Sequence, residues 1–374
     1  MKKLLISIVT AFAAISIFAA GSLFAAGPQM KFTEATELTM VGKVFPDTPN
    51  PYERMDFTKY GGWTEKDINL LEMSSGIIIS FKTNSPVISV KPEFKSICTT
   101  NASGFASRGF DLYIKKDGVW KWAGVTSFGM DMSKENGKER VLATDMDSSV
   151  KECIMYLPTY SKETSVKIGV TEESFIEKGA VPFKHRICIH GSSFMHGAST
   201  GRAGQTVPGF LTRMTGFQFC SLGVSGDCRM QPQFANALKD AEVDAYVIDA
   251  FSNGSAQTVQ ENLFNFIETL QSTKPDVPII FISTIWRERR NFNMAEDKRE
   301  QEKIDMANKL MKEALKKYKN VYYITVGDAA DKTGDTSLDG VHPSDWGYHL
   351  WAESIVKPLT KILAKYGIRS ASCK

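Results

Sequence analysis

The sequence predicts an α/β domain with a parallel sheet, preceded by an antiparallel β-sandwich. Residues 33–170 carry many short β-branched runs and turn formers but no helical periodicity, which is typical of a sandwich. After Pro182 the pattern changes, and short apolar runs alternate with helix-like segments. The chain has 374 residues, enough for two or three domains of ordinary size. We therefore assign residues 27–183 to the sandwich and residues 184–374 to the α/β domain.

Residues 1–26 predict a secretory signal peptide. Lys2 and Lys3 precede an apolar run over residues 4–20, and small residues follow that run. We expect its removal to leave a secreted or periplasmic bacterial protein without stable membrane association. An uncleaved membrane anchor is the alternative, because the apolar run borders on the length that spans a bilayer.

Composition and charge exclude one class of partner. Apolar residues make up 43% of the chain and charged residues 23%, as in folded soluble domains. The formal net charge is +3, from 45 Lys and Arg against 42 Asp and Glu. Without Lys2 and Lys3 the count is 43 against 42, a net charge of +1. A nearly neutral chain lacks the positive field that attracts nucleic acid, so we expect no nucleic-acid partner.

Turn formers separate the predicted strands of the sandwich. Asn84-Ser-Pro lies between two β-branched runs, and Asp117-Gly118 joins two further runs into a hairpin. The predicted strands are residues 75–81, 87–92, 110–115, 119–122 and 165–170. This domain shows no grouping of catalytic side chains, so we expect the chemistry to lie in the second domain.

Five short apolar runs alternate with four helix-like segments in the second domain. The runs are residues 186–190, 217–222, 245–250, 278–283 and 321–324. The helix-like segments are residues 231–239, 258–272, 295–318 and 344–364. Strands that alternate with helices predict a parallel sheet with helices on both of its faces.

The six cysteines indicate no metal site. None lies in a CxxC pair or at the spacing of zinc ligands. Cys188 and Cys220 lie inside predicted strands, so we expect buried thiols there. A disulfide between Cys98 and Cys153 is left open, as is the rest of the disulfide pattern.

Polar residues follow four of the predicted parallel strands. They lie at the edge of the sheet where open parallel sheets bind their ligands. Ser193 ends the Gly-Ser-Ser that follows the first strand, and Gly226 follows the second. Asn253 follows the third strand, and Asp339 and His342 follow the fifth. We expect these five residues to converge on one site.

These residue types suit acyl transfer through a serine nucleophile. The Ser193 hydroxyl attacks a carbonyl once a base removes its proton, and His342 is the predicted base. Asp339 lies three residues before that histidine and is predicted to orient its ring. The backbone N–H groups of Ser193 and Gly226 and the side-chain amide of Asn253 are the predicted oxyanion hole. This chemistry requires no metal and no cofactor.

Other residues compete for these roles. Ser192 is the rival nucleophile, and His190 and His196 are alternative bases. A histidine so near the serine in sequence reaches its hydroxyl poorly, so we favour the more distant base. Asp328 and Asp331 are alternative orienting acids, but neither stands three residues before a histidine.

Three arginines follow the fourth strand at the same edge of the sheet. Arg287, Arg289 and Arg290 could contact an acidic or polar sugar, but we interpret them as solvated loop charges. The neighbouring Trp286 is a candidate platform for a sugar ring, and a packing role for it is equally open.

The second domain resembles an SGNH (GDSL-type) hydrolase, a family named for Ser, Gly, Asn and His in separate sequence blocks. The corresponding blocks are Gly191-Ser-Ser, Ser225-Gly-Asp, Ser252-Asn-Gly and Asp339-Gly-Val-His. The first block differs from the commoner Gly-Asp-Ser, and the third lacks the frequent Gly-Asn-Asp. The resemblance implies a flavodoxin-like sheet and the same five site residues.

The first domain is similar to the GxDLY-type β-sandwich that precedes an SGNH domain in some bacterial secreted hydrolases. It carries Gly109-Phe-Asp-Leu-Tyr, with Trp120 and Trp122 nearby. This resemblance implies a jelly-roll-like sandwich. Together the two resemblances cover nearly all of the chain after about residue 33.

The resemblance implies a secreted serine esterase that removes acetyl or other short acyl groups from carbohydrate. A lipase or thioesterase acting on longer acyl chains is one alternative, and a non-catalytic glycan-binding protein is another. An acylated carbohydrate or another small ester is the expected partner, and the oligomeric state is left open.

Overall fold

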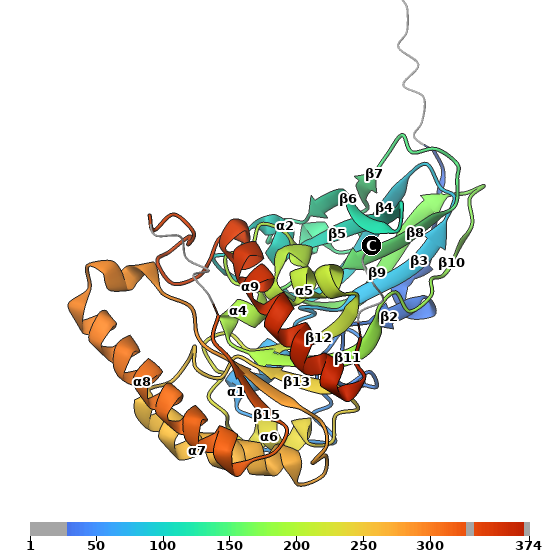
Figure 1. Cartoon of the computed structure of the whole chain (residues 1–374). Helices are drawn as coiled ribbons and strands as arrows, with labels where there is room; N and C mark the ends of the chain where they lie inside the picture. Colours follow the sequence, from blue (N-terminus) through green and yellow to red (C-terminus); the bar gives the residue numbers. More distant parts are fainter. Residues whose placement is uncertain (1–27, 327–332, 370–374) are drawn as a thin grey trace, which may run out of the picture.

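The computed structural model describes residues 28–326 and 333–369. The predicted signal peptide and the alternative acids Asp328 and Asp331 lie outside these ranges. The described chain forms two antiparallel sheets and one parallel sheet (Figure 1). No helix within these ranges is long and apolar enough to cross a membrane. The predicted fold class, a β-sandwich followed by an α/β domain, is confirmed.

The sandwich consists of a four-stranded and a six-stranded sheet. The first has the order β1 (Met30–Glu34), β9 (Ser161–Thr171), β4 (Ile88–Ile97) and β7 (Arg140–Ala143). The second has the order β10 (Ile176–Lys178), β3 (Ile78–Thr83), β8 (Lys151–Tyr156), β5 (Gly109–Lys116) and β6 (Val119–Ser127), and β2 (Thr39–Val41) also pairs with β3. Phe81, Val90 and Phe110 belong to the apolar core between the sheets. The predicted hairpin joins β5 to β6, where Asp117 and Gly118 have the positive φ angles, 55° and 78°, that a type I′ turn needs.

The second domain is built on a five-stranded parallel sheet. Its order is β12 (Phe217–Gly223), β11 (Lys184–Gly191), β13 (Ala245–Ile248), β14 (Ile279–Ile282) and β15 (Val321–Ile324). Helices α5 (Val207–Thr215) and α9 (Asp345–Leu363) cover one face of this sheet. Helices α6 (Pro232–Leu238), α7 (Ala256–Gln271) and α8 (Met294–Lys317) cover the other (Figure 1). The four predicted helices are therefore confirmed, and α5 is an addition to them.

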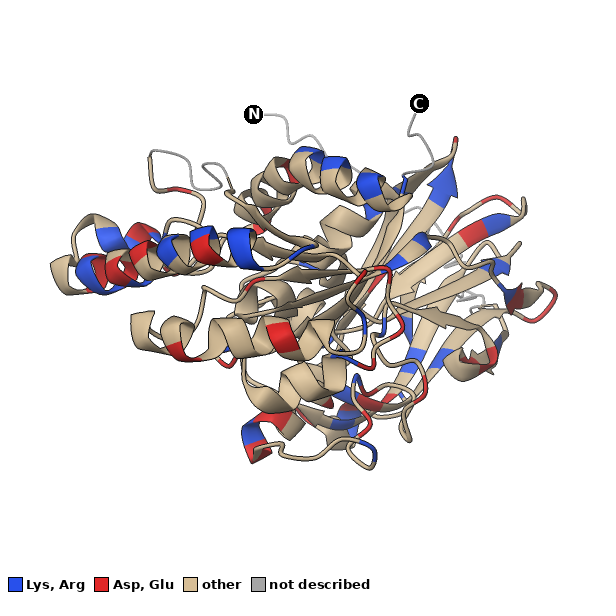
Figure 2. Ribbon diagram, turned by 60° about the horizontal axis from the view of Figure 1, so that its bottom comes forward, with Lys and Arg blue, Asp and Glu red and all other residues tan. Residues whose placement is uncertain are grey.

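Charged residues of both signs are intermixed over both domains (Figure 2). Along α8, Glu296 pairs with Arg299, and Lys298 lies 4.0 Å from Glu302. Pairs of this kind within one turn are typical of a solvated helix face. This distribution agrees with the nearly neutral charge of the sequence.

The cysteines of the described chain are all free. The Cys98–Cys153 disulfide that the sequence left open is not formed, because Cys98 packs against the core that includes α6 and α7, whereas Cys153 is buried in the core of the sandwich. Cys98 follows β4 of the four-stranded sheet, whereas Cys153 lies on β8 of the six-stranded sheet. Cys188 and Cys220 face each other on β11 and β12 as buried thiols, and burial raises the pKa of Cys220 to about 12.

The segment between β2 and β3 leaves the sandwich and packs against the α/β domain. Val44 and Met55 lie in the same apolar core as Phe234 of α6. The buried Arg54 donates three hydrogen bonds to backbone carbonyls, one of them to Gly223 O at 3.0 Å. The same segment also forms α1 (Glu65–Leu71).

The sequence predicted that the sandwich domain ends and the α/β domain begins at residue 183. That boundary stays a prediction.

The Gly-Phe-Asp-Leu-Tyr motif lies on β5 and contacts the α/β domain. Asp111 is fully buried and accepts hydrogen bonds from Gly204 N at 3.0 Å and Arg202 Nη1 at 2.9 Å. The Arg213 guanidinium lies 4.4 Å from the centre of the Tyr113 ring. The motif therefore supplies an ion pair and a cation–π contact between the two domains.

Asp111→Ala is expected to destabilise the protein by about 3 kcal/mol, since it leaves a guanidinium and a backbone N–H at the interface without their acceptor. This value is at the low end of the range for breaking a buried ion pair, because the Arg202 side chain is 22% exposed to solvent. Urea unfolding measures the effect. Lys121→Ala, at an exposed position of β6, is the matched control. An unchanged unfolding midpoint in Asp111→Ala would show that the motif does not hold the domains together.

Candidate active site

Ser193 begins α4 (Ser193–His196), just after β11 ends at Gly191. Asp249, which follows β13, accepts hydrogen bonds from the Ser192 backbone N–H at 3.1 Å and the Ser192 hydroxyl at 2.6 Å. The Ser192 hydroxyl also accepts a hydrogen bond from Phe194 N as the helix cap. These bonds hold Ser192 in the turn, while Ser193 lines a cavity.

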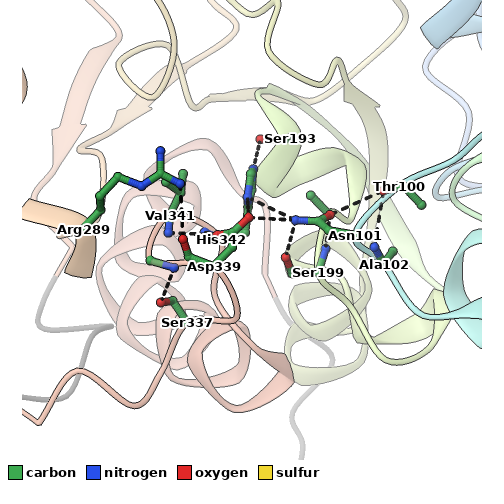
Figure 3. Close-up of polar contacts among 12 residues, drawn as sticks. Thr100, Asn101, Ala102, Ser193, Ser199, Arg289, Ser337, Asp339, Val341 and His342 are labelled. Carbon is green, nitrogen blue, oxygen red and sulfur yellow. Dashed lines mark hydrogen bonds and ion pairs between the residues drawn. The ribbon is translucent and has the colours of Figure 1, made fainter. Parts of the chain in front are cut away.

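Ser193, His342 and Asp339 form a chain of hydrogen bonds (Figure 3). Ser193 Oγ lies 2.8 Å from His342 Nε2, and His342 Nδ1 lies 2.8 Å from Asp339 Oδ2. Asp339 Oδ1 accepts hydrogen bonds from the backbone N–H groups of Val341 at 2.9 Å and His342 at 2.7 Å. The structure thus brings together the three residues that the sequence predicted as nucleophile, base and orienting acid.

The ionisation of Asp339 sets the tautomer of the neighbouring ring. Partial burial raises the pKa of Asp339, but hydrogen bonds from the His342 backbone and ring and from Val341 N outweigh burial and lower the pKa to about 2. The carboxylate is therefore ionised at neutral pH and accepts the proton on His342 Nδ1. This leaves Nε2 with the lone pair that faces Ser193 Oγ.

The three predicted oxyanion donors belong to residues that line one cavity, namely Ser193, Gly226 and Asn253. Asn253 Oδ1 accepts a hydrogen bond from Cys228 N at 3.1 Å, so Nδ2 is the end of the amide that can donate toward the cavity. Gly226 has a φ angle of 67°, and its carbonyl accepts a hydrogen bond from Lys66 Nζ of α1 at 3.0 Å. The Gly226 carbonyl is thus held from the first domain, and Arg229 Nη2 of the second domain also donates to it at 3.2 Å.

The alternative bases do not reach Ser193. His190 is fully buried, its Nδ1 lies 2.8 Å from Leu222 O, and burial lowers its pKa to about 4. His196 is also fully buried, with Nε2 2.9 Å from Thr159 O. Both are packing histidines, so the geometry agrees with the preference for the distant base.

The cavity over Ser193 has a volume of about 530 Å³, and both domains line it. Leu70, Met73 and Tyr160 contribute apolar side chains, and Asn101 contributes an amide from the loop after β4. The sequence predicted no site residue in the first domain, and the structure adds these four as residues that line the cavity. A short polar loop between strands carries no periodic pattern, so nothing in the sequence pointed to it.

Two family models match the chain. The model of the GDSL-like lipase/acylhydrolase family matches residues 184–360. The model named GxDLY, which describes the N-terminus of SGNH hydrolase-type esterases, matches residues 30–176. A protein of known structure from Bacteroides ovatus, described as a GDSL-like lipase, is 34% identical to this chain, with a TM-score of 0.86. The alignment covers 90% of this chain and 98% of that protein. The chain belongs to the GDSL-like lipase/acylhydrolase family.

Two further solved structures share the fold of this hydrolase at lower identity. A salicylyl-acyltransferase from a tetracycline biosynthetic pathway is 19% identical with a TM-score of 0.69, covering 91% of this chain and 98% of its own. A family two carbohydrate esterase from Clostridium thermocellum, in complex with cellohexaose, is 12% identical with a TM-score of 0.56, covering 78% of this chain and 93% of its own. No curated protein sequence matches the chain significantly.

Arg287 and Arg290 hold the segments that follow β14, which corrects their interpretation as solvated charges, whereas the Arg289 side chain is exposed, as expected. Arg287 lies 3.1 Å from Glu300 of α8 and donates to Ser252 O, next to Asn253. The Arg290 guanidinium lies 4.0 Å from the centre of the Trp286 ring and covers one of its faces. Their partners lie on α8 and on neighbouring loops, so sequence spacing carried no signal for them.

Glu288 fixes the loop that carries Asp339. Its carboxylate accepts hydrogen bonds from Thr336 N at 2.9 Å, Thr336 Oγ1 at 2.7 Å and Ser337 N at 3.2 Å. The neighbouring Arg289 N–H donates to Gly340 O at 2.8 Å. These contacts attach residues 336–340 to the segment after β14.

Proposed function

We propose that this hydrolase is an exported serine esterase that removes acetyl or other short acyl groups from carbohydrate. The observation that carries the proposal is the hydrogen-bonded chain from Ser193 through His342 to Asp339, beside a cavity that three oxyanion donors line. Export rests on the predicted signal peptide, and N-terminal sequencing of the natural protein recovered outside the cytoplasm tests it.

In the proposed mechanism, His342 Nε2 accepts the hydroxyl proton of Ser193 as Oγ attacks the ester carbonyl carbon. The carbonyl oxygen becomes negative and is stabilised by the N–H groups of Ser193 and Gly226 and by Asn253 Nδ2. The imidazolium then gives its proton to the sugar oxygen, which leaves as an alcohol while the acyl group stays on Ser193. Water, deprotonated by the same ring, then attacks the acyl carbonyl carbon. The bond to Ser193 Oγ breaks, the ring returns its proton to Oγ, and the acid leaves.

The mixed lining of the cavity supports an ester with a polar alcohol component. Apolar side chains such as Leu70 and Met73 form part of the wall, and Thr100, Asn101 and Arg287 supply polar groups at the same cavity. The carbohydrate esterase that shares this fold was solved with cellohexaose, which supports a sugar as the alcohol component.

A chain-length series of p-nitrophenyl esters, run beside acetylated polysaccharides, tests this proposal. We expect kcat/KM to be highest for the acetate and to fall by about 10-fold or more for an octanoate, because a longer chain would cover polar groups of the cavity wall without giving them hydrogen-bond partners. We also expect acetate release from the polysaccharide. A clear preference for long acyl chains would instead indicate a lipase or thioesterase. Binding of the polysaccharide without turnover of any ester would indicate a glycan-binding protein.

A further inference from the structure

A loop of the β-sandwich reaches the triad from the other domain. Residues 98–103 connect β4 to α2 (Gly104–Ser107), and Ser103 N donates to Thr200 O at 3.0 Å, just beyond the nucleophile helix. The side chain of Asn101 lies between Asp339 and Ser199 (Figure 3). A residue of the first domain thus stands beside the proton-transfer chain of the second.

Contacts with Ser199 set the orientation of the Asn101 amide. Asn101 Oδ1 accepts a hydrogen bond from Ser199 N at 3.1 Å, and Nδ2 lies 2.8 Å from Ser199 Oγ. Because the oxygen of the amide receives the Ser199 N–H, the NH₂ group is the end that faces Asp339, with Nδ2 2.9 Å from Asp339 Oδ2. Ser199 has a φ angle of 65°, an uncommon conformation that this paired contact helps to hold.

The Asn101 amide has two N–H groups and three neighbours. The third neighbour is His342 Nδ1, at 3.4 Å. When Nδ1 carries the proton that it donates to Asp339, both nitrogens are donors and no hydrogen bond forms between them. The two N–H groups therefore go to Ser199 Oγ and Asp339 Oδ2. The Asp339 carboxylate then accepts four hydrogen bonds, two at each oxygen.

We propose that Asn101 is a positioning residue through which the β-sandwich orients the catalytic carboxylate, an inference that rests on the proposed function. The bonds at Asp339 Oδ1 come from residues of its own loop and fix the carboxylate only relative to that loop. The bond from Asn101 fixes Oδ2, which holds the His342 ring, relative to the first domain and to the loop after α4. Alignment of the ring with Ser193 thus depends on the docking of the two domains.

Two variants of Asn101 and a matched control at Asn84 test this role. Asn101→Asp keeps the shape of the side chain and the acceptor for Ser199 N, but it places an oxygen where Nδ2 donates to Asp339. Asn101→Ala removes the whole group. With p-nitrophenyl acetate, kcat is expected to fall about 10-fold in Asn101→Ala and further in Asn101→Asp, while KM stays within about twofold. Asn84→Asp makes the same exchange in a turn of the first domain that does not line the cavity, and it keeps the acceptor for Phe175 N. This control is expected to keep kcat within about twofold of wild type.

The outcomes separate a positioning role from domain docking. Thermal unfolding shows which variants are folded. If Asn101→Ala is unstable, the kcat of the isosteric Asn101→Asp tests the positioning role. Wild-type kcat in Asn101→Asp, or an equal loss in Asn84→Asp, would overturn the inference. Ser193→Ala is measured in parallel. If wild type has no more activity than Ser193→Ala, the proposed function fails, and the proposed role of Asn101 fails with it. If Ser193→Ala is inactive while wild type and both Asn101 variants are equally active, only the inference about Asn101 fails.

Discussion

Ser193→Ala is expected to lower kcat for p-nitrophenyl acetate by at least about 10⁴-fold, because it removes the hydroxyl that lies 2.8 Å from His342 Nε2. The turn around this residue is held by the bonds of Ser192 to Asp249 and Phe194, so the variant is expected to fold normally. Steady-state kinetics and thermal unfolding measure the two expectations.

Ser192→Ala is the matched control for this experiment. It loses a helix cap and a hydrogen bond to Asp249, which we expect to cost about 1–2 kcal/mol of stability. The nucleophile stays in place, so kcat is expected to remain within about 10-fold of wild type. An inactive Ser192→Ala beside an active Ser193→Ala would reverse the assignment of the nucleophile.

Asp339→Asn is expected to lower kcat by about 10³–10⁴-fold while leaving the loop in place. The backbone N–H groups of Val341 and His342 can still donate to the amide oxygen of the new asparagine. With its oxygen held in this way, the amide NH₂ group faces His342 Nδ1. The ring can accept that N–H only by carrying its own proton on Nε2. It then has no lone pair for the Ser193 proton. Kinetics with p-nitrophenyl acetate at neutral and mildly alkaline pH measures the loss.

Asp345→Asn provides the control for this exchange. Asp345 lies at the start of α9 and accepts a hydrogen bond from Gly201 N at 2.7 Å, outside the triad. We expect this variant to keep kcat close to that of wild type. A kcat for Asp339→Asn within about 10-fold of wild type would show that the ring needs no carboxylate to hold its tautomer.

The five site residues that the sequence predicted occupy the same kind of position in the fold. Ser193, Gly226, Asn253, Asp339 and His342 all follow strands of a parallel sheet, and such strands end at one edge of the sheet. Alternation of apolar runs with helical segments is a strong local signal, so both the sheet and its edge could be predicted. The contacts between Ser193, His342 and Asp339 followed from that topology.

The first domain's share of the site could not be predicted in the same way. Asn101 lies in a polar loop, and Lys66 lies on the short helix α1, which binds the Gly226 carbonyl across the domain interface. Their roles depend on how the domains dock, and residue spacing within one domain carries no information about docking. Glu288 was missed for a similar reason, since its partners lie on a loop far along the chain.

Helix α5 was missed because its local signals are weak. It has nine residues, and Gly209 in its first turn lowers helix propensity. The Thr206 side chain caps its N-terminus by accepting a hydrogen bond from Gly209 N at 3.1 Å. Packing of its Val207 and Leu211 against the sheet stabilises it, which is a tertiary effect.

Reaction with a fluorophosphonate, followed by peptide mapping by mass spectrometry, tests the central claim most directly. Such a reagent phosphonylates a serine whose proton a neighbouring base removes. We predict one label per molecule, on Ser193, with esterase activity lost in proportion to labelling, and no label in Ser193→Ala. Full inactivation with the label on Ser192 or on another residue would contradict this account.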